Sequence, residues 1–313
     1  MKNLGKILKI KMIGNLFRLT RYILLISLAF PINLFSQTYD SLNTITGHKA
    51  KVYCSNGAGK RAEKIADRCD KVFAYYKASI NFEPSVNLLI LNPKDWTTYS
   101  AKGAVYGMPH YTTNQTLVVA SEDNAFWKSF IPPVDKLPED LSKTIVKTYS
   151  DENGVLTMQP FFDLLAIHEL GHAFHVQGEL IMQRKWMQEL FANIFLHTYI
   201  ADNESELLQS LTVFPEMVIK GGTNDFKYIT LTEFENKYNE IATENPKNYG
   251  WYQCRLHYAA STIYNLGGSN VIKNLWATLQ KQKKPLNDSS FANLLANDVH
   301  TTVANVQLQW ENK

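Results

Sequence analysis

The feature that most constrains the fold is a pair of histidines inside an apolar segment, in residues 168–172, which read His-Glu-Leu-Gly-His. Residues four apart on an α-helix project from one face, one turn from each other, so His168 and His172 can reach a single metal ion. The surrounding segment is apolar, with a first-turn proline at Pro160 and a stop at Gly178. It therefore predicts a buried helix from Pro160 to Gly178, with its histidines directed at a site that other elements must complete.

Three more polar residues fit a metal site that uses these histidines. Glu169 lies between them and is placed to act as general base towards a water activated by the metal. A second apolar helix, predicted from about residue 184 to 200, supplies Glu189 as third ligand. Two imidazoles and one carboxylate are a typical Zn²⁺ donor set that leaves a fourth position for water. Asn193, one turn beyond Glu189, is predicted to hydrogen-bond a ligand imidazole and orient it.

Two other side chains compete for the place of third ligand. His175 shares a helix face with His172 but lies nearly two turns from His168, so a regular helix cannot bring all three to one metal. We therefore expect His175 beside the site, and Glu179 in the following turn is a weaker candidate than Glu189. The three-histidine class of zinc sites needs glycine at 175 and histidine at 178, but the chain has His175 and Gly178.

The order of the predicted elements indicates an α+β fold. A helix over residues 57–80 is followed by short apolar strands over 86–91 and 115–120, and the composition of 121–159 predicts an irregular surface excursion. The predicted helix has an apolar stripe at three- and four-residue steps, formed by Ala62, Ile65, Ala66, Cys69, Val72, Phe73 and Tyr76. We divide the chain into a β-rich part (37–159) and a helical part (160–313) that carries the metal site. The helical part includes a third helix ending at residues 267–268 and one or two closing helices in the last 25 residues.

The N-terminus has the pattern of an export signal. Residues 1–36 contain six Lys or Arg and no acidic residue, and an apolar run is broken at Pro31 before it is long enough to span a membrane. We predict cleavage after Ser36, a periplasmic or extracellular protein, and no stable membrane span after cleavage; an uncleaved anchor is the alternative. The remaining chain has 26 basic and 29 acidic residues, so it has no basic excess to suggest a nucleic-acid partner.

The cysteines give no zinc-binding pattern. There are three of them, Cys54, Cys69 and Cys254, and none belongs to a CxxC motif. An exported protein can contain a disulfide, and Cys54 with Cys69 would close a modest loop, but an odd count leaves one thiol over and the pairing open.

At this point the chain resembles the gluzincin group of zinc metallopeptidases, which combine HExxH with a downstream glutamate. Residues 186–192 are similar to the W-x-x-E-x-F-A stretch of the aminopeptidase branch, and the spacing from Glu189 to Asn193 resembles the thermolysin type. The resemblance implies a zincin-like fold, with a small mixed sheet whose edge strand lies over the cleft. It also implies that His168, His172 and Glu189 bind zinc and that Glu169 is the base.

The resemblance also points to a phenol that stabilises the oxyanion. The stretch 252–268 is similar to a helix that runs from a catalytic tyrosine to a Gly-Gly end, which implies Tyr252 as donor, with Tyr258 and His257 as alternatives. Only 16 residues separate His172 from Glu189, and no G-x-M-E-N segment is present to hold a substrate amine. An aminopeptidase specificity is therefore not implied. We expect the strand over residues 115–120 to form the sheet edge, where a peptide could pair as an added strand.

The predicted function is that of an exported zinc metallopeptidase acting on a peptide or protein substrate. The alternatives are a catalytically inactive zincin-fold binding protein and a zinc hydrolase of non-peptide amides such as those of the cell wall. Substrate preference, endo- or exopeptidase action and oligomeric state do not follow from these motifs.

Overall fold

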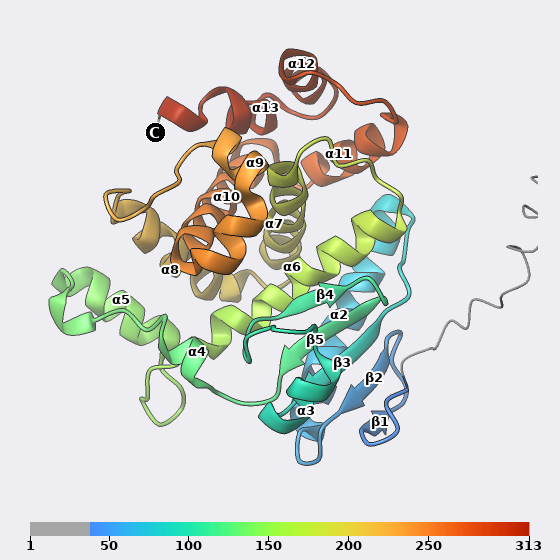
Figure 1. Ribbon diagram of the computed structural model, residues 1–313, viewed down its shortest axis with the longest axis vertical. Helices are drawn as coiled ribbons and strands as arrows, with labels where there is room; N and C mark the ends of the chain where they lie inside the picture. The colour runs from blue at the N-terminus through green and yellow to red at the C-terminus, as the bar shows by residue number, and fades with distance from the viewer. Residues whose placement is uncertain (1–37, 313) are drawn as a thin grey trace, which may run out of the picture. The chain divides into compact units, whose positions relative to one another are not determined.

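A computed structural model describes residues 38–312, and from Asp40 onward the chain forms one compact unit. The predicted signal peptide (1–36) lies outside the described residues. Figure 1 shows an α+β arrangement in which a sheet occupies one half of this unit and most of the helices occupy the other. The predicted fold class is confirmed at this level.

The sheet has five strands in the order β1-β2-β3-β5-β4. Their bounds are Asn43–Ile45 for β1, Lys51–Cys54 for β2, Asn87–Leu91 for β3, His110–Thr112 for β4 and Thr116–Ala120 for β5. The three central strands are parallel to one another, and β1 and β4 pair antiparallel at the two edges. The sheet is therefore mixed, as predicted.

The strand at the edge is not the one expected. All five residues of β5 are buried, and β5 lies between β3 and β4, with Leu117 opposite Tyr111 and Val118 opposite Leu89. The prediction that residues 115–120 form the edge was therefore wrong. The edge strand is β4, whose three residues, His-Tyr-Thr, are too few and too polar to show a strand pattern in the sequence.

Two helices pack against the sheet. Helix α2 (Gly59–Ile80) covers β1 to β3, and the seven residues of its predicted apolar stripe are all buried. Helix α6 (Gln159–Gln177) contacts β4 and β5 on one side and α7 and α8 on the other. Because α6 runs between the sheet and the helical half, it is buried around most of its circumference (Figure 1).

The helical half follows α6. It contains the predicted helices α7 (Lys185–Asn203) and α10 (Pro246–Gly267), together with the closing helices α12 (Asp288–Asp298) and α13 (Thr301–Leu308). Three further helices were not predicted: α8 (Leu208–Lys220), α9 (Leu231–Glu244) and α11 (Asn270–Lys281). One hydrophobic core extends from the sheet through these helices to Trp310 near the C-terminus.

The segment from 121 to 159 is more ordered than its composition suggests. It contains α4 (Ala125–Lys128) and α5 (Glu139–Tyr149), and α5 packs on α8 with Ile145 and Tyr149 buried. The other short elements are α3 (Pro93–Tyr99) and 3₁₀ turns over Val134–Lys136, Ser205–Leu207 and Trp310–Asn312.

Two further predictions concern a disulfide between cysteines and a membrane span. Cys54, Cys69 and Cys254 are all buried and free, so the structure contains no disulfide between Cys54 and Cys69. None of the helices within residues 38–312 has the length and apolar character needed to cross a membrane.

Candidate metal centre

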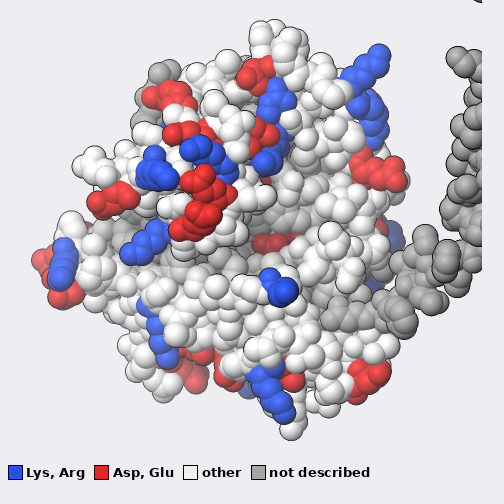
Figure 2. Space-filling model, viewed as in Figure 1, with Lys and Arg blue, Asp and Glu red and all other residues white. Residues whose placement is uncertain are grey.

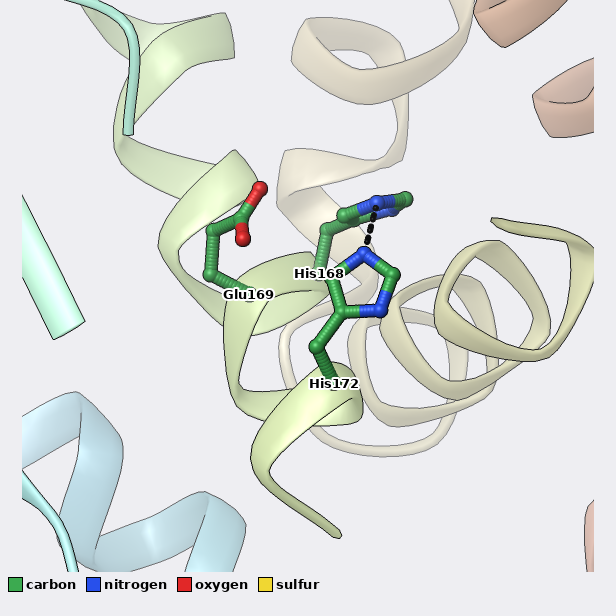
Figure 3. A group of neighbouring side chains, drawn as sticks. All are labelled: His168, Glu169 and His172. Atoms are coloured by element: carbon green, nitrogen blue, oxygen red, sulfur yellow. Dashed lines mark hydrogen bonds between the residues drawn. The ribbon is translucent and has the colours of Figure 1, made fainter. Parts of the chain in front are cut away.

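The predicted motif lies in the middle of α6, where its two imidazoles point to the same side of the helix (Figure 3). The Nε2 atoms of His168 and His172 are 3.1 Å apart. With Glu169 they form a group of three potential ligands that could hold a metal ion. His168 is buried, and the side chain of His172 is 13% exposed, so the pair lies at the boundary between core and solvent.

Helix α7 brings Glu189 to the same point. Its Oε2 atom lies 3.3 Å from Nε2 of His168 and 3.6 Å from Nε2 of His172. The two Nε2 atoms and Oε2 of Glu189 therefore form a nearly equilateral triangle. The structure thus brings together the three residues predicted as ligands.

The close approach of α6 and α7 depends on Gly171. A Cβ atom built on this residue would lie 3.0 Å from the Cα of Ala192 and 3.2 Å from its Cβ. Ala192 is one turn beyond Glu189 on α7, so the contact at Gly171 sets the distance at which Glu189 meets the histidines. The close packing of α6 on α7 therefore explains why a glycine stands at position 171.

Glu189 is a buried carboxylate that needs a compensating positive charge. It is 2% exposed, and its only ion-pair partners in the described part of the chain are His168 and His172. Burial by itself raises the pKa of Glu189, but the adjacent His172 and His168 outweigh burial and hold that pKa well below its ordinary range. A carboxylate that stays ionised in the interior is stabilised either by imidazolium or by a bound cation.

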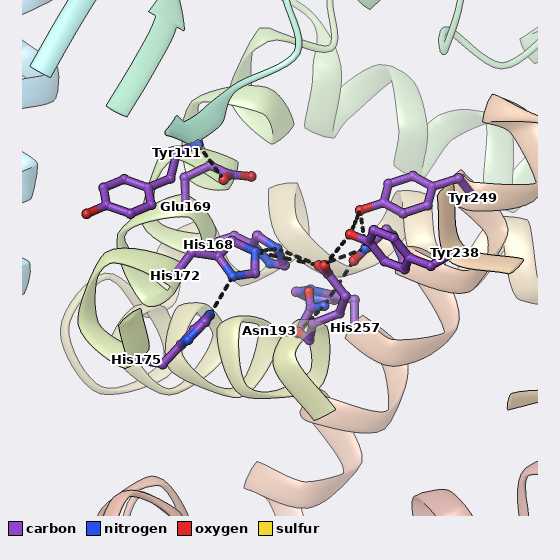
Figure 4. Close-up of polar contacts among 11 residues, drawn as sticks. Tyr111, His168, Glu169, His172, His175, Asn193, Tyr238, Tyr249 and His257 are labelled. Carbon is purple, nitrogen blue, oxygen red and sulfur yellow. Dashed lines mark hydrogen bonds and ion pairs between the residues drawn. The ribbon is translucent and has the colours of Figure 1, made fainter. Parts of the chain in front are cut away.

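Glu169 points away from the imidazole pair towards the sheet (Figure 4). Its Oε2 accepts a hydrogen bond of 2.9 Å from the backbone N–H of Tyr111 in the edge strand β4. Loss of solvation raises the pKa of Glu169 to about 7, against the opposing effects of His172 and the Tyr111 hydrogen bond. A carboxyl with a pKa near neutrality is suited to accept and return a proton.

His175 lies beside the site, as predicted. Its Nε2 is 3.0 Å from Nδ1 of His172, and burial, together with His172, lowers its pKa to about 3. A neutral His175 offers Nε2 as an acceptor, so Nδ1–H of His172 can donate to it while Nε2 of His172 faces the other ligands. Glu179 is exposed beyond the end of α6, where it cannot act as a ligand.

The outer side of Glu189 contacts residues that sequence reasoning missed. The hydroxyl of Tyr238 on α9 donates to Oε1 at 2.8 Å, and Nε2 of Gln253 on α10 donates to Oε2 at 2.9 Å. Tyr249 on α10 receives a second hydrogen bond from Gln253, and its hydroxyl is 3.3 Å from that of Tyr238. Lys237, directly before Tyr238, has non-helical backbone angles, and this kink has no signature in the sequence.

Asn193 does not contact either ligand imidazole. Its side-chain N–H donates to the backbone carbonyl of Glu189 at 3.0 Å, and its Oδ1 lies 3.1 Å from Nδ1 of His257. The prediction that Asn193 orients His168 or His172 was wrong, because it faces α10 rather than α6. The Nδ1 atom of His168 is buried without a hydrogen-bond partner.

The three residues predicted as oxyanion donors lie elsewhere. Tyr252 is fully buried, donates its hydroxyl hydrogen to the carbonyl of Thr230 at 2.8 Å and stacks on Trp310. Tyr258 is 42% exposed, on a different face of α10 from Gln253 and Tyr249, and His257 is buried against Asn193. The placement of Tyr252 contradicts its assignment. The phenols near the ligands are Tyr238 and Tyr249, which lie across the histidines from Glu169 (Figure 4).

Figure 2 shows a groove that crosses the face of the molecule between the sheet half and the helical half, with acidic atoms visible on its floor. Comparison with models of protein families gave no match, and no curated protein is similar enough in sequence to match the chain.

Proposed function

We propose that this protein is a zinc-dependent metallopeptidase in which His168, His172 and Glu189 hold the metal and Glu169 is the general base. The observation that carries the proposal is the spacing of the three donor atoms. Tetrahedral bonds of 2.0–2.2 Å place two ligand atoms about 3.3–3.6 Å apart. Two of the observed separations, 3.3 and 3.6 Å, fall in this range, and the third, 3.1 Å, lies about 0.2 Å below it.

The type of donor favours zinc over other common ions. Calcium and magnesium select oxygen ligands, whereas two imidazoles with one carboxylate suit zinc. Three protein donors leave one position of a tetrahedral site for a water molecule, as catalytic zinc sites require.

A bound zinc ion would polarise the substrate carbonyl and lower the pKa of a water molecule towards 7. Glu169 would accept a proton from the water that attacks the carbonyl carbon of the scissile bond, and would return this proton to the amine nitrogen as the C–N bond breaks. The Tyr111 N–H keeps the Glu169 carboxylate at the sheet side of the site, so its position does not depend on substrate.

Tyr249 is the phenol that we assign to the developing oxyanion, in place of Tyr252. The hydroxyl hydrogen of Tyr238 is already committed to Glu189, whereas Tyr249 accepts from Gln253 and can donate its own hydrogen only across the long 3.3 Å contact to the Tyr238 hydroxyl, from which it can turn towards substrate. Tyr249 is partly exposed and lies opposite Glu169, on the side where negative charge would develop.

The edge strand supports a peptide as substrate. Tyr111 directs its N–H away from β5 and towards α6, so β4 presents main-chain groups along the groove. An extended peptide can pair with such an edge. Gln177, at the end of α6, fixes this edge by donating to the hydroxyl of Tyr111 and to the carbonyl of Ser85. Because helix α6 lies under the short edge strand β4, we also infer a zincin-like fold. We propose further that the protein is exported by means of residues 1–36.

The test combines metal analysis with peptide digestion. We expect the purified protein to bind one zinc ion and to cleave an unbiased peptide mixture, with products read by mass spectrometry and lost on chelation. Glu169→Gln should keep the zinc and lose turnover. Glu179→Gln, the same change at an exposed position, should behave as the wild type. A fully active Glu169→Gln variant, or wild-type protein that takes up no zinc, would overturn the proposal.

A further inference from the structure

A row of buried and half-buried polar side chains fills the interface between α7 and α10. On α7 the row consists of residues spaced four apart, and α10 repeats the same spacing. We call this row the polar seam; its members are Glu189, Asn193 and His197 on α7 and Tyr249, Gln253 and His257 on α10. Because residues four apart share a helix face, the two helices present matching polar stripes to each other.

The contacts across the seam pair the stripes in register. Gln253 donates to Glu189 at 2.9 Å, and one turn further along both helices Asn193 meets His257 at 3.1 Å. One more turn along α7, the ring of His197 lies 5.7 Å from that of His257. Asn193, His197 and His257 are each about 3% exposed, so the seam leads from the metal site into the core.

An apolar interface would be the less costly choice at this position. Buried polar groups contribute little unless each is hydrogen-bonded, and a hydrophobic replacement of similar volume is often neutral or stabilising. The Nε2 of His257 and the Nδ1 of His197 are in fact buried without partners. The seam therefore needs a reason other than the stability of the helix pair.

The direction of every hydrogen bond in the seam follows from the carboxylate at its end. Gln253 turns its N–H₂ group towards the carboxyl oxygen of Glu189, so its Oε1 faces Asn193, whose Nδ2 is 3.4 Å away. Asn193 then has Oδ1 facing His257, which must carry its proton on Nδ1. No member can reverse without breaking a bond of its neighbour.

We propose that Gln253, Asn193 and His257 are positioning residues that hold Oε2 of Glu189 towards the two histidines for metal binding. The inference rests on the proposed zinc site and names residues that act on it from outside. Tyr238 occupies Oε1, so with Gln253 on Oε2 the carboxylate cannot rotate about its own axis. Glu189 is thereby presented as a ligand through one oxygen.

The test measures metal affinity rather than turnover. Gln253→Met keeps the length and volume of the side chain but removes the donor to Glu189. We expect its zinc affinity, measured by competition with a chromogenic chelator, to fall about 10- to 100-fold, as when outer partners of metal ligands are removed. The control is Gln209→Met on α8, the same change at an exposed position, which should bind zinc as the wild type does.

A cobalt(II) spectrum separates positioning from a merely structural role. If Gln253 fixes the binding mode of Glu189, the visible bands of the cobalt-loaded Gln253→Met variant should shift relative to those of the wild type and of the control. His257→Phe, two links away from Glu189, should weaken zinc binding less than Gln253→Met. Since both residues belong to one hydrogen-bonded chain that ends at Glu189, the double variant should lose less than the two single losses combined.

The outcomes distinguish this inference from the proposed function. Wild-type protein that binds no zinc would overturn both. Wild-type protein that binds zinc, with Gln253→Met and His257→Phe at wild-type affinity and with an unchanged cobalt spectrum, would overturn the seam alone. If Gln253→Met does not fold, as judged by circular dichroism, the His257→Phe affinity and spectrum decide the question.

Discussion

Replacing Gly171 by alanine should weaken metal binding without a matching loss of stability in the metal-free protein. The added Cβ would lie 3.0 Å from the Cα of Ala192, whereas carbon atoms in contact lie about 3.5–4.0 Å apart. Helix α7 must therefore move away from α6 by about 0.5 Å at the turn that follows Glu189. Metal–ligand distances tolerate only about 0.2 Å, so a shift of this size takes Glu189 out of position.

The two effects of this substitution on stability oppose each other. Alanine in place of glycine within a helix gains about 1 kcal/mol, and overpacking a tight contact costs about 1–3 kcal/mol. The free energy of unfolding of the metal-free protein should therefore fall by no more than about 2 kcal/mol. Zinc affinity should fall about 10- to 100-fold, which is the usual loss when the residues that orient a metal ligand are changed.

The assay pairs urea unfolding of the metal-free variant with chelator competition for zinc. Gly250, in the first turns of α10, is the matched control because a Cβ there would meet no atom within 4 Å. Gly250→Ala should be neutral or stabilising and should bind zinc normally. If Gly171→Ala binds zinc as tightly as Gly250→Ala, the packing of α6 on α7 does not set the position of Glu189, and our reasoning about the motif glycine fails.

Three further changes probe the phenols, the metal and the frame of the site. Tyr249→Phe should lower kcat about 10²- to 10³-fold at unchanged zinc content. Tyr252→Phe should lower the free energy of unfolding by about 1 kcal/mol and leave kcat intact. Equal kcat values for the two variants would contradict the assignment of Tyr249 as oxyanion donor. Zinc at a thousand times its Kd should stabilise the fold by about 4 kcal/mol, which for a unit of this size raises Tm by roughly 7 °C; calorimetry should show this shift lost on chelation and absent from His168→Ala. Arg61 on α2 makes a two-bond ion pair with Asp163 of α6. Replacing Arg61 by methionine should lower the free energy of unfolding by about 3–5 kcal/mol, because Asp163 is left without its partner. A loss below 1 kcal/mol in urea unfolding would show that the pair is dispensable.

Predictions that depended on spacing along one helix agree with the structure. The stripe of α2 is buried residue for residue, and the extent of α6, from Pro160 in its first turn to Gly178 beyond its end, follows from local signals. His168 and His172 project together for the same reason, because the helix period alone determines which side chains share a face. The exclusion of His175 as a ligand used the same period, and His175 lies outside the ligand triangle.

Predictions that depended on how one helix faces another were the ones that failed. The spacing from Glu189 to Asn193 places both on one face of α7, but only packing decides that Asn193 meets His257 of α10 and not an imidazole of α6. Aromatic residues recur along α10, and nothing local separates Tyr252, which is directed into the core, from Tyr249, which is directed at the ligands. The rotation of α10 about its axis makes that choice.

The sequence by itself therefore determined the helix that carries the HExxH motif and the residue types of a candidate metal site, since both follow from short-range geometry. Only the tertiary structure decided what surrounds that site. The edge strand β4 exists because β5 offers a partner, and Tyr238 reaches Glu189 from α9, directly after the kink at Lys237. These are consequences of contacts between segments far apart in the chain, where the free energy of packing outweighs local preference.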